Sequence, residues 1–168
     1  MDVFIEKIVA RKKTGQDRLM VAGIIVAAFV ALIVVSSIPI INSLGPVLWI
    51  VIGFLAFQFA KSRNIEFEYA VTNGDLDIDK IIAQRKRKRI FSGSAKDFEI
   101  VAKVKSDKYT NEYKNIAKKI EAVSSMEAPD IYFVVAPYKG ERTIVYFEPD
   151  KRMIDNFKIF IPRKISEW

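Results

Sequence analysis

An uncharged stretch of 42 residues, from Leu19 to Ala60, constrains this chain more than any other feature. A helix needs about 20 apolar residues to cross the hydrocarbon core of a bilayer, so the stretch is long enough for two crossings. Pro39 ends or kinks the first apolar segment, and Pro46 suits the first turn of a second helix. We therefore predict a two-helix transmembrane hairpin with spans over residues 19–38 and 44–60.

A cleaved signal peptide and a buried hairpin of a soluble protein are the two other interpretations of this stretch. A signal peptide has a shorter apolar core followed by a cleavage site, whereas here a second apolar segment follows directly. The uncharged length argues against a soluble hairpin. The spans contain no Asp, Glu, Lys, Arg or His, so we interpret the hairpin as an anchor rather than a transport pathway.

Basic residues flank both ends of the stretch, and the connecting turn carries none. By the positive-inside rule, both flanks are expected on the cytoplasmic side. The sequence thus predicts a multi-pass protein of the cell membrane with its N-terminus and C-terminus in the cytoplasm. The residues expected to set this topology are Arg11, Lys12, Lys13, Arg18, Lys61 and Arg63.

Small residues recur on both predicted spans, and close backbone approach at small residues is a known packing mode of membrane helices. We favour contacts within the hairpin, and a dimer face between two copies is the alternative. The expected contacts in an antiparallel hairpin are Gly23 with Ala60, Ala27 with Ala56, and Ala31 with Gly53.

Residues 1–16 form an N-terminal leader ahead of the hairpin at 17–62 and a cytosolic domain at 63–168. Within the leader, Phe4, Ile5, Ile8 and Val9 share one side of a helix over residues 1–13, which predicts an amphipathic helix. Such a helix either lies in the headgroup layer or docks on the soluble domain.

Alternating apolar and polar residues begin at residue 65 and indicate a half-buried strand up to Thr72. Asn73-Gly74 is the strongest two-residue signal for a hairpin turn, and a second alternating segment follows it. A two-residue turn pairs apolar residues on the same face and places Glu68 opposite Asp79. The basic run that follows is expected to continue the meander as a third strand.

The rest of the domain shows a further strand at 97–104, a helix at 111–123 and a second hairpin at 131–148. Asp150 is expected to cap a C-terminal amphipathic helix that ends at Pro162. This order predicts an α+β domain: an antiparallel bent sheet or partial barrel with an inserted helix, packed by the last helix.

The apolar hairpin is followed by the run Glu68-Tyr69-Ala70-Val71-Thr72-Asn73-Gly74-Asp75-Leu76-Asp77-Ile78 and then by a basic strand. This arrangement resembles small, uncharacterised bacterial membrane proteins that carry a pleckstrin-homology-like (PH-like) cytosolic domain. The resemblance covers residues 16–160 and departs from the pattern at the helix inserted at 111–123. It implies a membrane-proximal scaffold or binding domain without catalysis, and it supplies no site residues.

The basic run Arg85, Lys86, Arg87, Lys88 and Arg89 is the sharpest candidate site. One interpretation is structural pairing with Asp77, Asp79 and Glu68, and the other is contact with anionic lipid headgroups or a partner. Without the run, residues 64–168 carry 15 basic and 17 acidic residues, and no wide basic face with aromatic platforms is present. Nucleic acid is therefore not an expected partner.

No catalytic set or cofactor site is evident in the sequence. The chain has no Cys and no His, which removes the usual nucleophile, general base and metal ligands. The aspartates at 75, 77 and 79 lack the Gly and Glu of a calcium loop, because Lys80 and Lys86 stand in those positions. No phosphate-binding glycine motif occurs.

We therefore predict a membrane-anchored, non-catalytic interaction or scaffold module, with the lipid bilayer and a membrane protein as partners. A regulatory domain that contacts anionic lipid through residues 85–89 is the first alternative, and an uncharacterised hydrolase is the second.

Overall fold

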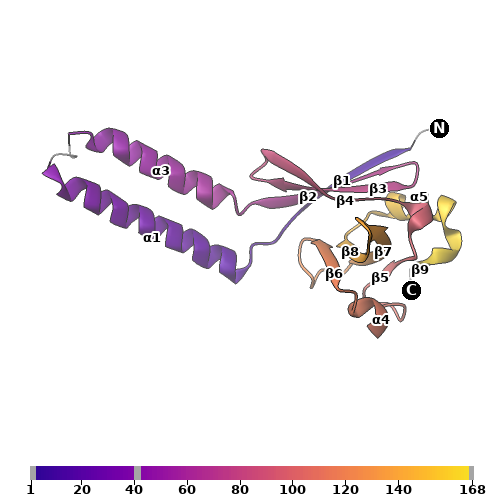
Figure 1. The fold of residues 1–168 in the computed structure, drawn as a ribbon. Helices are drawn as coiled ribbons and strands as arrows, with labels where there is room; N and C mark the ends of the chain where they lie inside the picture. The colour runs from indigo at the N-terminus through magenta and orange to yellow at the C-terminus, as the bar shows by residue number, and fades with distance from the viewer. Residues whose placement is uncertain (1–2, 40–42, 167–168) are drawn as a thin grey trace. The chain divides into compact units, whose positions relative to one another are not determined.

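The computed structural model describes residues 3–39 and 43–166. The chain divides into two compact units, one formed by residues 1–12 and 65–168 and the other by residues 13–64. The first unit carries the β-strands, and the second consists of two long helices (Figure 1).

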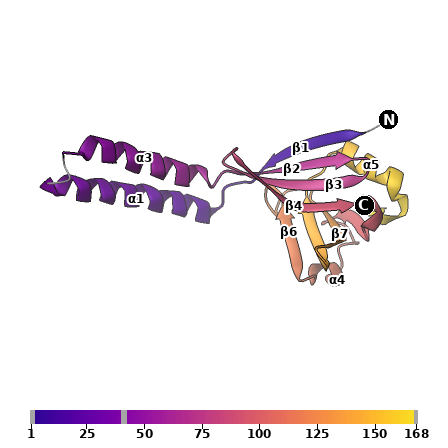
Figure 2. The same cartoon turned by 45° about the horizontal axis from the view of Figure 1, so that its top comes forward.

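Helices α1 (Gly15–Ser37) and α3 (Gly45–Lys61) form the second unit and lie side by side in both views (Figures 1 and 2). Thr14 caps α1 through a capping box, in which its hydroxyl accepts from the Asp17 N–H at 3.2 Å. Pro46 stands in the first turn of α3, where its missing N–H costs nothing. These local signals fix where each helix begins.

Both helices expose large apolar side chains, such as Leu19 at 74% and Phe29 at 64% on α1, and Ile50 at 73% on α3. By length and composition, α1 is able to cross a membrane, and no part of its apolar window is buried. Helix α3, with 17 residues, is a shorter apolar helix.

The small residues of the helices divide into two groups. Ala31, Ala56 and Ala60 are half-buried, whereas Gly23, Ala27 and Gly53 are exposed. A Cβ added at Gly23 or Gly53 would meet no atom within 4 Å. The predicted contacts of these residues within the hairpin stay a prediction. The larger residues Ile24 and Ile52 are also half-buried. The dimer face between two copies stays a prediction.

The first sheet contains β1 (Phe4–Ala10), β2 (Ile65–Thr72), β3 (Asp75–Ile82) and β4 (Lys86–Ser94) in the order β1-β2-β3-β4, all antiparallel. The predicted amphipathic helix in the leader was wrong, because this segment is the edge strand β1. Ile5 and Val9 point into the core, while Phe4 and Ile8 lie on the opposite face.

The predicted register of the β2–β3 hairpin is confirmed. Val71 pairs with Leu76, Tyr69 with Ile78, and Glu68 with Asp79. Asn73 and Gly74 form the turn with φ values of 50° and 89°, the left-handed conformations that a two-residue hairpin turn requires.

The second sheet contains β5 (Ile100–Lys103), β6 (Lys118–Ala122), β7 (Tyr132–Tyr138), β8 (Glu141–Phe147) and β9 (Ile165–Ser166) in the order β6-β8-β7-β5-β9. The β7–β8 hairpin follows the prediction, but β6 and β9 each pair in parallel with a neighbour. Short 3₁₀ turns at Ala95–Asp97 and Pro162–Lys164 precede β5 and β9, so the predicted strand at 97–104 begins later.

The predicted helix at 111–123 was largely wrong. Only α4 (Asn111–Lys114) is helical, and the chain then forms β6. Ile116 packs in one apolar cluster and Ile120 packs against the other. The two residues are four positions apart, but they do not share one face of a helix. The backbone of β6 completes the ladder beside β8, which a helix cannot do.

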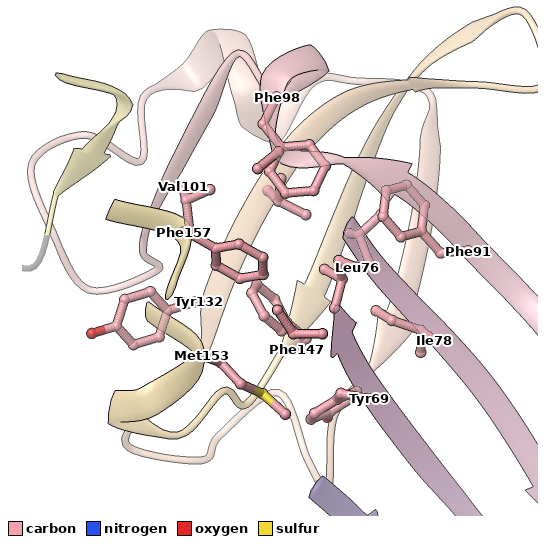
Figure 3. Close-up of a cluster of buried hydrophobic side chains, with 14 of the residues drawn as sticks. Tyr69, Leu76, Ile78, Phe91, Phe98, Val101, Tyr132, Phe147, Met153 and Phe157 are labelled. Atoms are coloured by element: carbon pink, nitrogen blue, oxygen red, sulfur yellow. The ribbon is translucent and has the colours of Figure 1, made fainter. Parts of the chain in front are cut away.

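The main core lies between the sheets and is closed by α5 (Lys151–Phe160). Figure 3 shows Met153 and Phe157 of α5 among side chains from both sheets, including Tyr69, Leu76 and Phe147. Asp150 caps α5, since its carboxylate accepts from the Met153 N–H at 2.9 Å, as predicted. A second apolar cluster covers the other face of the second sheet.

Candidate functional site on the four-stranded sheet

The face of the first sheet that points away from the core, here called the outer face, is rich in carboxylates. Because side chains alternate along a strand, the neighbours of the core residues on β1, β2 and β3 all point to this face. Two arginines of β4 lie beside them. The charged members of the outer face are Glu6, Glu66, Glu68, Asp75, Asp77, Asp79, Arg87 and Arg89.

Arg87 and Arg89 pair with the carboxylates of the outer face. Arg87 Nη2 lies 2.5 Å from Glu68 Oε2, and Arg89 Nη1 lies 2.7 Å from Asp77 Oδ2. The Arg89 Nε–H also donates to Asp79 Oδ1. Glu68 and Asp79 are only 5% and 7% exposed, so the two guanidinium groups neutralise buried charges. The predicted pairing is thus confirmed for these two members of the basic run.

The pKa of Glu68 lies above its usual range. Burial is the main cause, and the neighbouring Glu6 and Asp79 add to it, while Arg87 acts in the opposite direction. The pKa of Arg89 is raised by its hydrogen bond to Asp79 and by Asp77, against the effect of burial. This face therefore holds carboxylates that repel one another and guanidinium groups that hold them together.

Arg85, Lys86 and Lys88 differ from the two arginines. All three are exposed, and within residues 3–39 and 43–166 they make no ion pair. They lie at the β3–β4 turn, where Lys86 pairs with Ile82 and Lys88 with Lys80. The suggested contact of these residues with lipid or a partner stays a prediction.

The residues expected to set the membrane topology lie at the two chain links of the apolar unit. The Arg11 N–H donates to the Ile65 carbonyl at 2.9 Å, and the Lys12 N–H to the Ser124 carbonyl at 2.8 Å. Lys13 and Arg18 are exposed, whereas Lys61 and Arg63 are half-buried. Their role in setting the orientation stays a prediction.

The described residues contain no group of three or more His, Cys, Asp or Glu side chains arranged to hold a metal ion. Guanidinium groups occupy the space between the carboxylates of the outer face. The arrangement is suited to holding strands together and to presenting charge to a partner.

The profile of the family described as "Bacterial PH-like domain (DUF6106)" matches residues 1–167 of the chain. The chain belongs to this family. The match confirms the predicted resemblance to bacterial PH-like proteins. No curated protein and no solved structure matches the chain. PH-like domains often bind lipids or proteins, and they are generally non-catalytic.

Sequence reasoning missed the contribution of β1 to this PH-like domain, and with it Glu6 on the outer face. The signal was present, because Ile5, Lys7 and Val9 alternate with Phe4, Glu6 and Ile8. Two adjacent apolar pairs four residues apart fit a helix equally well, so only the pairing of β1 with β2 distinguishes the two.

Proposed function

We propose that this PH-like protein is a membrane-anchored, non-catalytic interaction module whose helical unit crosses the membrane twice. The observation that carries the proposal is the pairing of β1 with β2. Ala10 pairs with Glu66, so the chain leaves the sheet and returns to it at adjacent positions. A single crossing would separate β1 from β2 by the thickness of the bilayer, and hence the number of crossings is even.

The exposed apolar surface supports two crossings rather than none. A helix that is apolar all round needs a nonaqueous environment, and neither α1 nor α3 buries its large side chains. Helix α3 is about 26 Å long at ~1.5 Å per residue, slightly less than the ~30 Å of a hydrocarbon core. Lys61 at its end is able to extend to the interface and compensate for the difference.

The orientation is proposed from charge. Basic residues stand at both links between the units, and this favours the cytoplasm for the PH-like domain and for both chain ends. The absence of Cys from the chain makes a direct test simple, because each introduced thiol is the only one present.

Single-Cys variants labelled with a membrane-impermeant maleimide test this topology. Leu44→Cys, at the turn between the helices, is expected to react in intact cells. Gln16→Cys and Lys151→Cys are expected to react only after permeabilisation. The protein is also expected to remain in the membrane pellet after carbonate extraction. Release by carbonate, or labelling of Lys151→Cys in intact cells, would overturn the proposal.

Contact with anionic lipid headgroups is a second candidate function. It is favoured by Arg85, Lys86 and Lys88, which are exposed and form no ion pair with any residue that the structure describes. Ile82 of the adjoining β3 pairs with Ile65, so these cations lie at the end of the sheet where β2 begins. Ile65 follows Lys61 by four residues, a reach of at most about 14 Å. Each Lys or Arg close to an anionic leaflet contributes about 1 kcal/mol.

Full-length protein in nanodiscs tests the lipid contact. An environment-sensitive dye on Lys88→Cys is expected to show stronger emission with phosphatidylglycerol than with phosphatidylcholine, and the difference is expected to fall with added salt. The same dye on Lys151→Cys serves as the control and should not respond. Equal emission in both lipids would rule out the contact.

A further inference from the structure

Strand β1 has a free edge, because among the strands that the structure describes only β2 pairs with it (Figure 2). The Asn73 N–H donates to the Val3 carbonyl at 3.2 Å, and the Arg11 N–H to the Ile65 carbonyl at 2.9 Å. Odd-numbered residues of this segment therefore bond to β2. Since antiparallel bonding alternates, the backbone groups of the even-numbered residues point to the free edge. These are Phe4, Glu6, Ile8 and Ala10.

The edge is long and carries exposed apolar side chains. Phe4 and Ile8 are 65% and 57% exposed on the outer face, next to the free backbone groups. Edge strands are usually blocked by a bulge, a proline, a shortened strand or charges. Strand β1 has seven residues, no proline and an uninterrupted register with β2, whereas β4 at the opposite edge carries a bulge and the basic run.

Charge gives the edge a specific pattern. Glu6 lies on the outer face between Phe4 and Ile8. Lys7 points to the inner face, where its Nζ donates to the Glu148 carbonyl at 2.7 Å. There it lines a groove of about 460 Å³ whose charged residues include Lys103, Lys151, Asp130 and Asp150. A strand added beside β1 would place its side chains next to Glu6 on one face and next to Lys7, at this groove, on the other.

We propose that β1 is the docking strand for an extended segment of a partner protein, which adds to the sheet in antiparallel direction. Read from its N-terminus, the core of the segment has five positions. The first and fifth residues are apolar, the second is acidic, the third is basic, and the fourth is of any type. These lie opposite Ile8, Lys7, Glu6, Ile5 and Phe4 in that order. The inference rests on the proposed interaction function and names its surface and the chemistry of its partner.

A second copy of the chain fits this edge poorly. The self-pairing that uses all four free residues places Lys7 opposite Lys7, and the one centred on Glu6 places Glu6 opposite Glu6. In either register the two copies of β1 run in opposite directions. Because the link to α1 begins just after Ala10, the links of the two copies would leave the paired strands at opposite ends.

The test uses full-length protein in detergent and a fluorescent peptide with the core Val-Glu-Lys-Thr-Val. Saturable binding is expected by fluorescence anisotropy. Glu6→Pro removes a free-edge N–H together with the Glu6 carboxylate, and it leaves the backbone bonds of β1 to β2 in place. The fold should therefore stay intact, as checked by circular dichroism, and binding should weaken at least about tenfold. Glu127→Lys, on an exposed loop, is the control for a change of charge and should leave binding unchanged.

A charge exchange sharpens the test and does not depend on how proline is tolerated. Glu6→Lys should weaken binding of the first peptide about tenfold and bind a second peptide, Val-Glu-Glu-Thr-Val, more tightly than the unmodified protein does. Absence of saturable binding, or equal binding of both peptides by both proteins, would overturn the proposal. So would a dimer that Glu6→Pro converts to monomers, because a second copy would then occupy the edge. The membrane topology is tested separately by thiol labelling. Failure of peptide binding would therefore leave the proposed topology intact, and failure of the topology would leave the proposed docking strand intact.

Discussion

The hydroxyl group of Tyr69 donates a hydrogen bond to the main-chain carbonyl oxygen of Ala122 and thereby joins β2 in one sheet to β6 in the other. The same hydroxyl accepts from the Glu148 N–H at 3.3 Å. Tyr69 is fully buried, and burial is the main reason why the pKa of its phenol lies above the usual value. One neutral hydroxyl thus satisfies two backbone groups at the junction of the sheets.

Replacement of Tyr69 by Phe is expected to lower the free energy of unfolding by about 1–2 kcal/mol, because the two buried backbone groups lose their partner. Urea unfolding of the detergent-solubilised chain, followed by near-UV circular dichroism, measures the change. Tyr138→Phe is the matched control, since no hydrogen bond of its hydroxyl occurs among the described residues. Equal losses for the two variants would contradict the assigned role of Tyr69.

Truncation of Phe157 on α5 is expected to be far more costly than truncation of its neighbour Ile159. Phe157 is fully buried and packs edge-on against Phe98, with ring centroids 5.9 Å apart, whereas Ile159 is 72% exposed. Phe157→Ala should cost about 3–5 kcal/mol, and Ile159→Ala less than about 0.5 kcal/mol. The midpoint of thermal unfolding provides the comparison, and similar midpoints would argue against α5 closing the core.

Two turn glycines separate backbone strain from crowding. Gly74 and Gly140 both have positive φ values, of 89° and 80°, but a Cβ at Gly74 would lie 2.6 Å from Phe160 Cδ2 while one at Gly140 meets nothing within 4 Å. Gly140→Ala is expected to cost about 1 kcal/mol from strain alone, and Gly74→Ala at least about 1 kcal/mol more. Chemical unfolding of both variants measures the difference, and a Gly140→Ala loss as large as that of Gly74→Ala would contradict it.

The raised pKa of Glu68 predicts a pH dependence of stability. The folded chain takes up the Glu68 proton at a higher pH than the unfolded chain, whose value lies near 4.5. The Glu68 contribution to the free energy of unfolding therefore rises as the pH falls from neutral to about 4.5, and is fully present below that value. Relative to a Glu68→Gln variant, the unmodified protein should gain stability over this range. A difference that stays constant or shrinks would show that Arg87 outweighs burial.

The β2–β3 hairpin and the capping of α5 were predictable because their signals are local. Asn73-Gly74 determines the turn, and the alternation of apolar and polar residues determines the register of the hairpin. The Asp150 carboxylate accepts a hydrogen bond from the first turn of α5. The pairing of Arg87 and Arg89 with Glu68, Asp77 and Asp79 followed from that register once β4 continued the meander.

Strands β1 and β6 were not predictable in the same way, because their partners are distant in sequence. Apolar residues at 4, 5, 8 and 9, and again at 113, 116, 117 and 120, fit a helix when viewed alone. These segments form strands because β2 and β8 each offer an edge with which they pair. The local pattern of apolar residues does not reveal either edge. The second sheet is also buried on both faces, which removes the alternation that marks a half-buried strand.

The insertion of the apolar unit between β1 and β2 has a consequence for the order of events during synthesis. Ala10 emerges from the ribosome 56 residues before its partner Glu66, a delay of about 3–11 s at ~5–20 residues per second. Strand β1 therefore stays unpaired until both apolar helices and then β2 have been synthesised. The PH-like domain is therefore able to close only after both apolar helices have been synthesised, which makes its folding a late event in the production of the chain.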